Sequence, residues 1–412
     1  MADDDETMPL LPTAAPATTR IHFLDNLRTV LVILVIFHHA AILSAPLRHG
    51  RDPREDAIIA VFTTTNEAFL WNTFYLVSGC SSAVALEAEP APSECEFVER
   101  RMLRVGVPAV LWGFLGRKVR FAWVFVFIDY ERVRDLLTGP VMYVALLLVF
   151  DGGHLALRRK GVTSLVGRST VMKVFIGTAF AALLLLSSYV NALPGGTNNL
   201  PSSFTSLFSS FDFPLPDAPV SCAVTFFIGA NYSKLKDVVP SVFRRVAFPL
   251  LLVLSYATLH IACVLSPSIR AFSDSRDNPL DINKRRALLN AGLNRHTTAF
   301  VLWDTLSALL LPISFVAFFS STPMLSTHWS RLDTGRWKKP HVLVYVHMIP
   351  IFFGRALSFY LGLNDDVIRT LFIGLFGVFG GWKGITLVEA AYRWGSWLGT
   401  QDSEAEVVQT AS

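Results

Sequence analysis

The chain alternates long runs of apolar residues with short polar or charged stretches. A helix needs roughly 20 consecutive, mostly apolar residues to cross a bilayer, so the pattern predicts an all-α polytopic membrane bundle of about ten transmembrane helices. We place these helices at Leu27–Ala45, Ile58–Val84, Val105–Ile128, Val141–Phe150 with extensions at both ends, Val171–Val190, Ala218–Ala230, Val246–Leu265, Thr298–Ser320, Val342–Leu361 and Val367–Ala391. The fourth and sixth of these runs are short.

Polar segments flank the predicted bundle. Residues 1–20 are acidic and then rich in Pro, Ala and Thr, the opposite of the basic region that opens a cleavable signal peptide. We therefore expect a disordered cytosolic tail over 1–20, one membrane domain over 21–395 that begins with an uncleaved signal anchor, and a cytosolic tail over 396–412. The sequence contains no visible repeat at a fixed period, so it does not indicate the two-fold symmetry of many transporters.

Composition supports the membrane prediction. Of 412 residues, 52% are hydrophobic and 17% are charged, and the mean hydropathy is +0.45, a balance that would leave a soluble globule with too much apolar surface. The net charge of +4 is spread along the chain without a basic stripe, which excludes nucleic acid as a partner. The four cysteines lack C-x-x-C spacing and neighbouring histidine clusters, so we expect no metal site.

Basic residues predict the orientation. They gather in alternate connections between the predicted spans, and the positive-inside rule places such loops in the cytosol. The segment Asn191–Asp217 has no Lys or Arg and is expected on the lumenal or extracellular side, whereas Lys284, Arg285 and Arg286 run against the pattern. We expect both termini in the cytosol, in an endomembrane or the plasma membrane. The basic residues behind this prediction are Arg100, Arg101, Arg104, Arg158, Arg159, Lys160, Lys173, Lys234, Lys236, Arg244, Arg245, Arg336, Lys338 and Lys339.

The first predicted span carries the strongest candidate chemistry, His38 and His39 in an otherwise apolar run. Ionisable residues inside a membrane are costly and mark functional sites by default. Arg28 lies eleven residues before His39, which returns a helix to within ~20° of the same face and separates the two by about 16 Å along the axis. Asp25 is spaced to pair with Arg28. The alternative is a packing histidine with Arg28 as a surface anchor.

The second predicted span adds polar groups at membrane depth, Asn66 and Glu67, and the small-residue pair Ser78-Gly79. An unpaired carboxylate at this depth is costly, so Glu67 needs a partner such as His39, an arginine or water. Ser78 and Gly79 permit close approach of a second helix, and packing alone would explain them.

Two arginines follow the second span. Arg101 and Arg104 are three residues apart, which puts them on one face of a helix at the cytosolic entry of the third predicted span. Two guanidinium groups at this spacing can bind a phosphate or pyrophosphate with paired donors. The alternative is an anchor that contacts lipid headgroups.

Taken together and in order, these motifs resemble the acyltransferase-3 family of integral-membrane acyltransferases, and the first span is similar to the family's fungal members. The resemblance is clearest over the first third of the chain and looser in "GPVMYVALLLVF", "FFIGANYSKL" and "VYVHMIP". Departures are Met142-Tyr143 in place of Trp-Phe and Cys80 after the Ser-Gly pair, and these bear on substrate identity. The matching motifs are Leu24-Asp25-x-x-Arg28 with ten residues to His39, Phe74-x-x-x-Ser78-Gly79 and Phe97-x-x-Arg100-Arg101-x-x-Arg104-x-x-x-Pro108.

The resemblance implies transfer of an acyl group, with acetyl expected, from cytosolic acyl-CoA to a hydroxyl of a carbohydrate, lipid or small secondary metabolite. Burial favours the neutral imidazole, which suits His39 as the general base, with an acyl-histidine intermediate as the covalent variant. Arg28 would orient the cofactor or stabilise negative charge, and Glu67 would fix the tautomer of His39. The polyphosphate of coenzyme A would bind Arg101 and Arg104.

Four further ionisable residues in late spans, Asp304, His347, Arg355 and Lys383, are candidates either for an acceptor path or for structural ion pairs between helices. His347, with Tyr345, matches the family's late Tyr-x-x-His segment. Two other functional classes stay open: a transporter or flippase without acyl-transfer chemistry, since buried charges also serve translocation, and a non-catalytic scaffold or sensor. The presence of Arg28, His39, Arg101 and Arg104 argues against a scaffold or sensor whose site has decayed.

Overall fold

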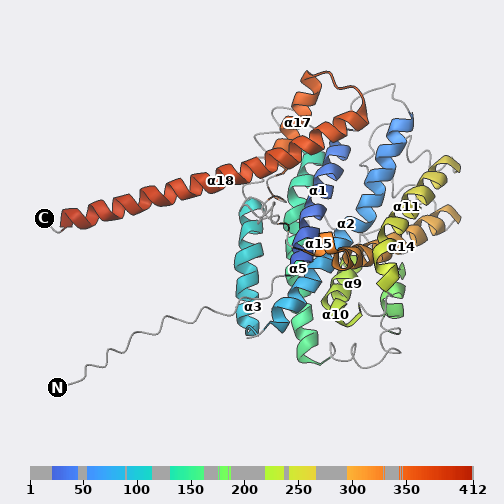
Figure 1. Ribbon diagram of the computed structural model, residues 1–412, viewed down its shortest axis with the longest axis horizontal. Coiled ribbons are helices and arrows are strands. Elements are labelled where there is room, and N and C mark those ends of the chain that lie inside the picture. Colours follow the sequence, from blue (N-terminus) through green and yellow to red (C-terminus); the bar gives the residue numbers. More distant parts are fainter. Residues whose placement is uncertain are drawn as a thin grey trace.

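The computed structural model describes residues 21–44, 53–88, 91–113, 130–161, parts of 175–186, 219–235, 241–265, 295–327, 329 and, with gaps at 344 and 346, 343–410. Every regular element in these residues is a helix, so the predicted all-α class is confirmed for the described chain (Figure 1). The principal helices are α1 (His22–Ser44), α2 (Pro53–Glu87), α3 (Glu94–Arg101), η1 (Met102–Gly106), α5 (Tyr130–Arg159), α9 (Pro219–Ala230), α10 (Tyr232–Leu235), α11 (Ser241–Leu265), α14 (Arg295–Ser321), α15 (Pro323–Ser326), α17 (Met348–Tyr360) and α18 (Asp366–Thr410).

Six of the described helices are long and apolar enough to cross a membrane: α1, α2, α5, α11, α14 and α18. This supports a multi-pass membrane protein, but the predicted count of about ten is not confirmed. The predicted sixth and ninth spans correspond to α9 and α17, which have 12 and 13 residues and are too short to cross a bilayer by themselves. Most of the predicted third span and half of the predicted fifth span lie outside the described residues.

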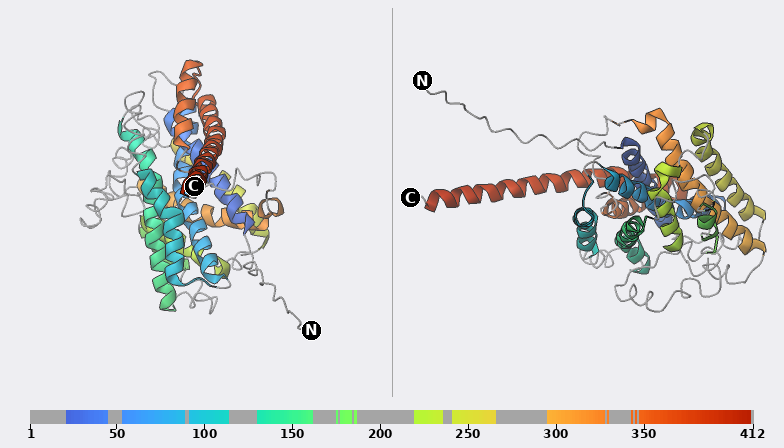
Figure 2. Two further views of the ribbon diagram at one scale, coloured as in Figure 1. Left: turned by 90° about the vertical axis from the view of Figure 1, so that its left-hand side faces the viewer. Right: turned by 90° about the horizontal axis from the view of Figure 1, so that it is seen from below.

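Helix α2 is the centre of the bundle and packs against α1, α9, α11 and α14, while α1 and α17 both pack along α18 (Figure 1). The C-terminal part of α18 projects far beyond the other helices in Figure 1 and in the right-hand view of Figure 2. The predicted boundary between membrane domain and tail at 395 therefore falls inside a helix that continues to Thr410. The predicted N-terminal tail, 1–20, lies outside the described residues.

Glycines set how closely the helices approach. A Cβ on Gly79 of α2 would lie 2.0 Å from the Phe226 carbonyl oxygen of α9, and one on Gly229 would lie 2.0 Å from the Leu76 carbonyl oxygen. The two backbones are therefore in direct contact, as small residues in membrane helices allow. The packing interpretation of Gly79 is confirmed.

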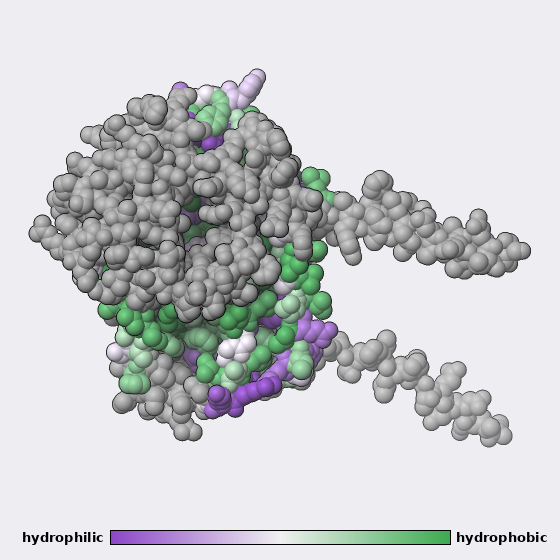
Figure 3. All heavy atoms as spheres, turned by 180° about the vertical axis from the view of Figure 1, so that it is seen from behind, coloured by the Kyte–Doolittle hydropathy of each residue, from purple (hydrophilic) through white to green (hydrophobic). Residues whose placement is uncertain are grey.

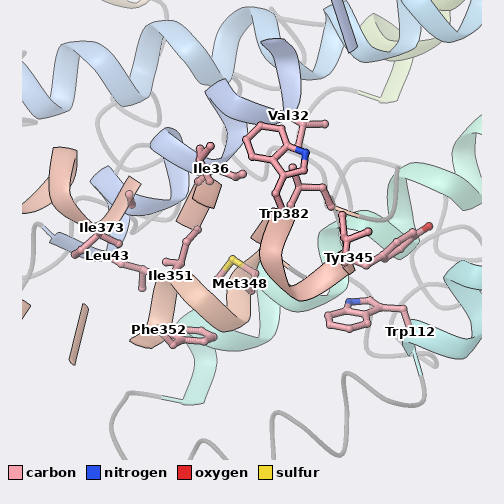
Figure 4. Close-up of a cluster of buried hydrophobic side chains, with 14 of the residues drawn as sticks. Val32, Ile36, Leu43, Trp112, Tyr345, Met348, Ile351, Phe352, Ile373 and Trp382 are labelled. Atoms are coloured by element: carbon pink, nitrogen blue, oxygen red, sulfur yellow. The ribbon is translucent and has the colours of Figure 1, made fainter. Parts of the chain in front are cut away.

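The same principle brings α1 and the segment before α17 onto α18. A Cβ on Gly377 would lie 2.7 Å from the Ile351 side chain and 2.8 Å from that of Ile36. A Cβ on Gly381 would lie 2.4 Å from the side chain of Leu343, four residues before His347. Figure 4 shows the buried cluster that results, with side chains of α1, α17 and α18 packed together.

The outer surface matches an apolar environment. Large hydrophobic side chains on α11 are exposed, including Leu250, Val253 and Ile261, and α18 exposes Phe379 and Leu387. In Figure 3 the described part of one face is mostly hydrophobic, with hydrophilic side chains gathered along its lower edge. A soluble protein would bury such surface, whereas acyl chains can cover it.

Candidate functional site

Two histidines from opposite ends of the chain meet inside the bundle. His39, near the end of α1, has its Nδ1 atom 2.9 Å from Nε2 of His347, the residue before α17. The two rings are nearly coplanar, with planes 17° apart and centroids 5.1 Å apart. His347 is fully buried at 0% exposure. The two rings therefore meet edge to edge and are joined by a hydrogen bond between these two nitrogens.

The backbone fixes which nitrogen carries each proton in this pair. Nδ1 of His347 lies 3.1 Å from the carbonyl oxygen of Leu343, and a carbonyl oxygen can only accept a hydrogen bond. In a neutral His347, Nδ1 is therefore the donor and Nε2 is the acceptor. Nδ1 of His39 must then donate to Nε2 of His347, which leaves Nε2 of His39 with an available lone pair.

His347 thus takes the part that the sequence assigned to Glu67, because it is His347 that hydrogen-bonds to Nδ1 of His39. Glu67 itself lies on α2 and is partly buried. Sequence reasoning placed His347 among candidates for an acceptor path or for structural ion pairs between helices, and not beside His39. The sequence did contain a signal, since a histidine in a late apolar run is costly without a buried polar partner. It did not show that this partner is His39, because the two histidines are 308 residues apart in the chain.

A second polar region lies towards the other end of α1. The Arg28 guanidinium donates to the Asp25 carboxylate at 3.1 Å and to the hydroxyl of Ser81 on α2. Both Arg28 and Asp25 keep about a third of their side-chain surface exposed, 33% and 34%. The predicted local pair of Asp25 and Arg28 is confirmed, and Ser81 ties it to the second helix.

Arg101 extends this region. Its Nε atom lies 3.1 Å from Oδ2 of Asp151 on α5, and its Nη2 donates to the hydroxyl of Ser82. Ser82 donates in turn to the other Asp151 oxygen at 2.5 Å, so the carboxylate is held on both sides. The Arg101 side chain is 18% exposed and that of Asp151 is 4% exposed. The guanidinium also lies over the ring of Phe97, 5.6 Å from its centroid.

Arg104 is placed differently. Residues Met102–Gly106 form a π-helical turn, whose wider hydrogen-bond spacing moves residues three apart away from a common face. Arg101 therefore points into the bundle and Arg104 is exposed. The structure brings Arg101 and Arg28 into one polar region with Ser81 and Ser82, and it leaves Arg104 at the surface. Short π-helical insertions are frequent at functional sites.

Ser78 joins the same region through an aromatic hydroxyl. Its Oγ lies 2.6 Å from the hydroxyl of Tyr143 on α5, and that ring packs against Phe74 and Tyr75 of α2. Ser78 is thus more than a packing residue, unlike its neighbour Gly79. Sequence analysis noted Tyr143 only as a departure from the family motif. Its hydroxyl connects α5 to Ser78 of α2.

Asp151 was missed by sequence reasoning. It follows the fourth predicted apolar run directly, and a carboxylate at that depth needs a partner. None of the contacts observed within the described part of the chain joins the remaining candidates to the histidine pair or the arginine region. Arg355 is buried and lies over Phe359 at 5.8 Å, Asp304 is partly buried on α14, and Lys383 is exposed on α18.

These contacts define a multi-pass helical membrane protein with two buried polar regions, a histidine pair and an arginine region. No family model, no curated protein sequence and no solved structure matches this chain.

Proposed function

We propose that the protein is a membrane O-acyltransferase that moves an acyl group, in the first instance acetyl, from acyl-CoA to a hydroxyl of a carbohydrate, lipid or small metabolite. The observation that supports this most is the hydrogen-bond chain from His39 through His347 to the carbonyl of Leu343. It leaves Nε2 of His39 as a proton acceptor in an oriented ring. A triad histidine is oriented in the same way by the group behind it.

The chemistry follows from that free lone pair. Nε2 of His39 accepts the proton of the acceptor hydroxyl while its oxygen attacks the thioester carbonyl carbon. The tetrahedral intermediate collapses, the carbon–sulfur bond breaks, and the departing thiolate takes the proton back from His39. General base catalysis of this kind contributes about 10²–10⁴-fold. An acyl-histidine intermediate formed on Nε2 is the covalent variant of the same proposal.

The arginine region supports a site for the cofactor. Coenzyme A carries phosphates, and guanidinium groups bind phosphates with paired donors. Arg104 is exposed at the surface, and Arg101 is held in place by Asp151 and Ser82 with its Nη1 atom not engaged by either. Arg28 lies eleven residues from His39 on one continuous helix, about 16 Å along the axis, a distance suited to the narrow pantetheine arm. In this proposal the arginine end of the bundle and both termini face the cytosol.

The test uses purified protein in lipid nanodiscs with radiolabelled acetyl-CoA. We expect wild type to bind acetyl-CoA and to hydrolyse or transfer its acetyl group. Arg104→Ala combined with Arg101→Lys should weaken binding, whereas His39→Ala should bind normally and lose turnover. If well-folded wild type neither binds nor turns over acetyl-CoA or a longer acyl-CoA, acyl transfer is wrong and the transporter class is favoured.

A further inference from the structure

The histidine pair joins two helices that pack against a common third one. His39 lies near the end of α1 and His347 immediately precedes α17, while α1 and α17 both pack along α18. The 2.9 Å hydrogen bond between the two rings therefore depends on where α18 holds the other two helices. Such a bond tolerates little displacement, since two polar atoms about 3.6 Å apart are no longer hydrogen-bonded.

Gly377 of α18 contacts both of these helices. A Cβ atom added to it would lie 2.7 Å from Cγ1 of Ile351 on α17 and 2.8 Å from Cγ2 of Ile36 on α1. Carbon atoms in contact are normally about 3.5–4.0 Å apart, so α1 and α17 occupy the space that a side chain at this position would need. Both isoleucines belong to the buried cluster of Figure 4.

Each isoleucine lies about one helical turn from a histidine. Ile36 is three residues before His39, which puts the two on the same side of α1 and about 4.5 Å apart along its axis. Ile351 is four residues after His347 and donates its backbone N–H to the His347 carbonyl at 3.2 Å, so it closes the turn that begins at this histidine. A displacement of either isoleucine backbone therefore displaces the neighbouring histidine.

The side chains alone cannot relieve the two contacts. Cγ1 and Cγ2 are bonded directly to Cβ, and a β-branched side chain in a helix has one strongly preferred χ1 rotamer. Ile36 and Ile351 are both 0% exposed, and a close-packed interior has no space for another rotamer. The two isoleucine atoms must themselves stay about 3.5 Å apart, so they lie in different directions from the added Cβ. Relieving both contacts therefore moves α1 and α17 apart.

We propose that Gly377 is a positioning residue for the histidine pair: the absence of a side chain there lets α1 and α17 meet on α18 with His39 and His347 hydrogen-bonded. Gly384 provides the matched control. It lies seven residues further along the same side of α18, and a Cβ added to it would have no atom of the described residues within 4 Å. The hydrogen bond does not depend on acyl transfer, whereas its effect on turnover rests on the proposed function.

The first readout is the hydrogen bond itself. Solid-state NMR of protein with ¹⁵N-labelled histidines in phosphatidylcholine bilayers detects the ¹⁵N–¹⁵N coupling across an N–H···N bond, and loss of the signal in His347→Leu assigns it to the pair. We expect the coupling in wild type and in Gly384→Ala, and its loss in Gly377→Ala. Gly377→Ala combined with Ile351→Ala should recover it, because the truncation removes the 2.7 Å contact and leaves room for α18 to shift.

The second readout is turnover of radiolabelled acetyl-CoA. Gly377→Ala should lower kcat about 5- to 100-fold, as the loss of one buried hydrogen bond would. The KM for acetyl-CoA should stay within about twofold of wild type, since the arginine region is unchanged. The double variant should recover part of kcat although its Tm stays below that of wild type, because the exchange leaves a cavity. If the glycine only stabilised the fold, kcat would follow Tm instead.

The inference is wrong if wild type lacks the coupling, if Gly377→Ala keeps it, or if Gly384→Ala loses it as well. Should Gly377→Ala not fold, the double variant decides: the coupling in that protein supports the inference, and its absence or a failure to fold overturns it. Loss of the coupling in Gly377→Ala together with no turnover by folded wild type would contradict the proposed function and leave the positioning role intact.

Discussion

The two polar regions of the bundle meet the cost of burial in different ways. In the arginine region, opposite charges are paired: Arg28 pairs with Asp25, and Arg101 pairs with Asp151. Each guanidinium also donates a hydrogen bond to a serine hydroxyl of α2. The histidine pair carries no fixed charge and forms a directional chain that ends on a backbone carbonyl. Paired charges hold helices together, whereas the hydrogen-bond chain of the histidines leaves the lone pair on Nε2 of His39 available to accept a proton. In the proposed function, the histidines carry the chemistry, and the arginines anchor the helices and bind the cofactor.

The largest expected effect tests the chemical role of the histidine pair. If His39 is the general base, as proposed, His39→Ala should lower acetyl transfer by about 10²–10⁴-fold, the contribution typical of such a base. Single-turnover transfer from radiolabelled acetyl-CoA measures it. His260→Ala is the control, since that histidine is exposed on α11 away from the pair. Transfer within a few-fold of wild type in His39→Ala would remove the chemical role of the histidine region.

Next in size is a loss of stability in the arginine region. Asp151→Asn should lower the free energy of unfolding by about 3 kcal/mol. This is the low end of the range for removing one partner of a buried ion pair, because the Arg101 side chain is partly exposed. Asp25→Asn, in the more exposed pair, should cost less than about 1 kcal/mol. Denaturation in detergent measures both.

A double variant separates anchoring from cofactor binding. Arg101→Met with Asp151→Leu removes both charges and should recover most of the stability, because no charge remains buried alone. Acetyl-CoA binding should stay weak in the same protein. If binding recovered together with stability, Arg101 would be a structural residue only.

The third prediction concerns the direction of the histidine chain. His347→Leu removes the acceptor for Nδ1 of His39 and should slow turnover about 5- to 100-fold, the equivalent of one buried hydrogen bond. His347→Gln offers an amide oxygen in place of Nε2 and should recover part of that loss. Acetyl-CoA KM should change little in either variant, since His347 lies away from the arginine region. Equal turnover in the two variants would mean that His347 acts through packing alone.

The smallest effect is expected at the surface. Arg104→Ala should raise the KM for acetyl-CoA less than about fivefold, because an exposed charge contributes little. The effect should shrink further as salt is added. Arg100→Ala, which removes an exposed arginine that pairs with Glu96 instead, is the control. A large, salt-independent rise in KM would place Arg104 inside the cofactor site rather than at its edge.

Local patterns in the sequence were sufficient for several features. Hydrophobic run length predicted a helical multi-pass protein, because crossing a bilayer requires that length whatever the neighbours are. Spacing within one helix predicted the Asp25–Arg28 pair. The Ser-Gly pair predicted a close helix contact, and Gly79 makes it. Run length did not distinguish full spans from the short helices α9 and α17, since apolar content alone does not fix where a helix ends.

The sequence by itself identified several residues that carry costly polar groups into the bundle, among them His39, Arg28 and Arg101, because an ionisable side chain within or beside an apolar run is visible without the fold. Only the tertiary structure decided how the cost is met. His347 contacts His39, which lies 308 residues away in the chain. Asp151 on α5 pairs with Arg101 at the end of α3. The π-helical turn separates Arg104 from Arg101. Such partners depend on which helix faces pack together, and that is set by the glycines of α2 and α18 acting with the whole set of apolar contacts.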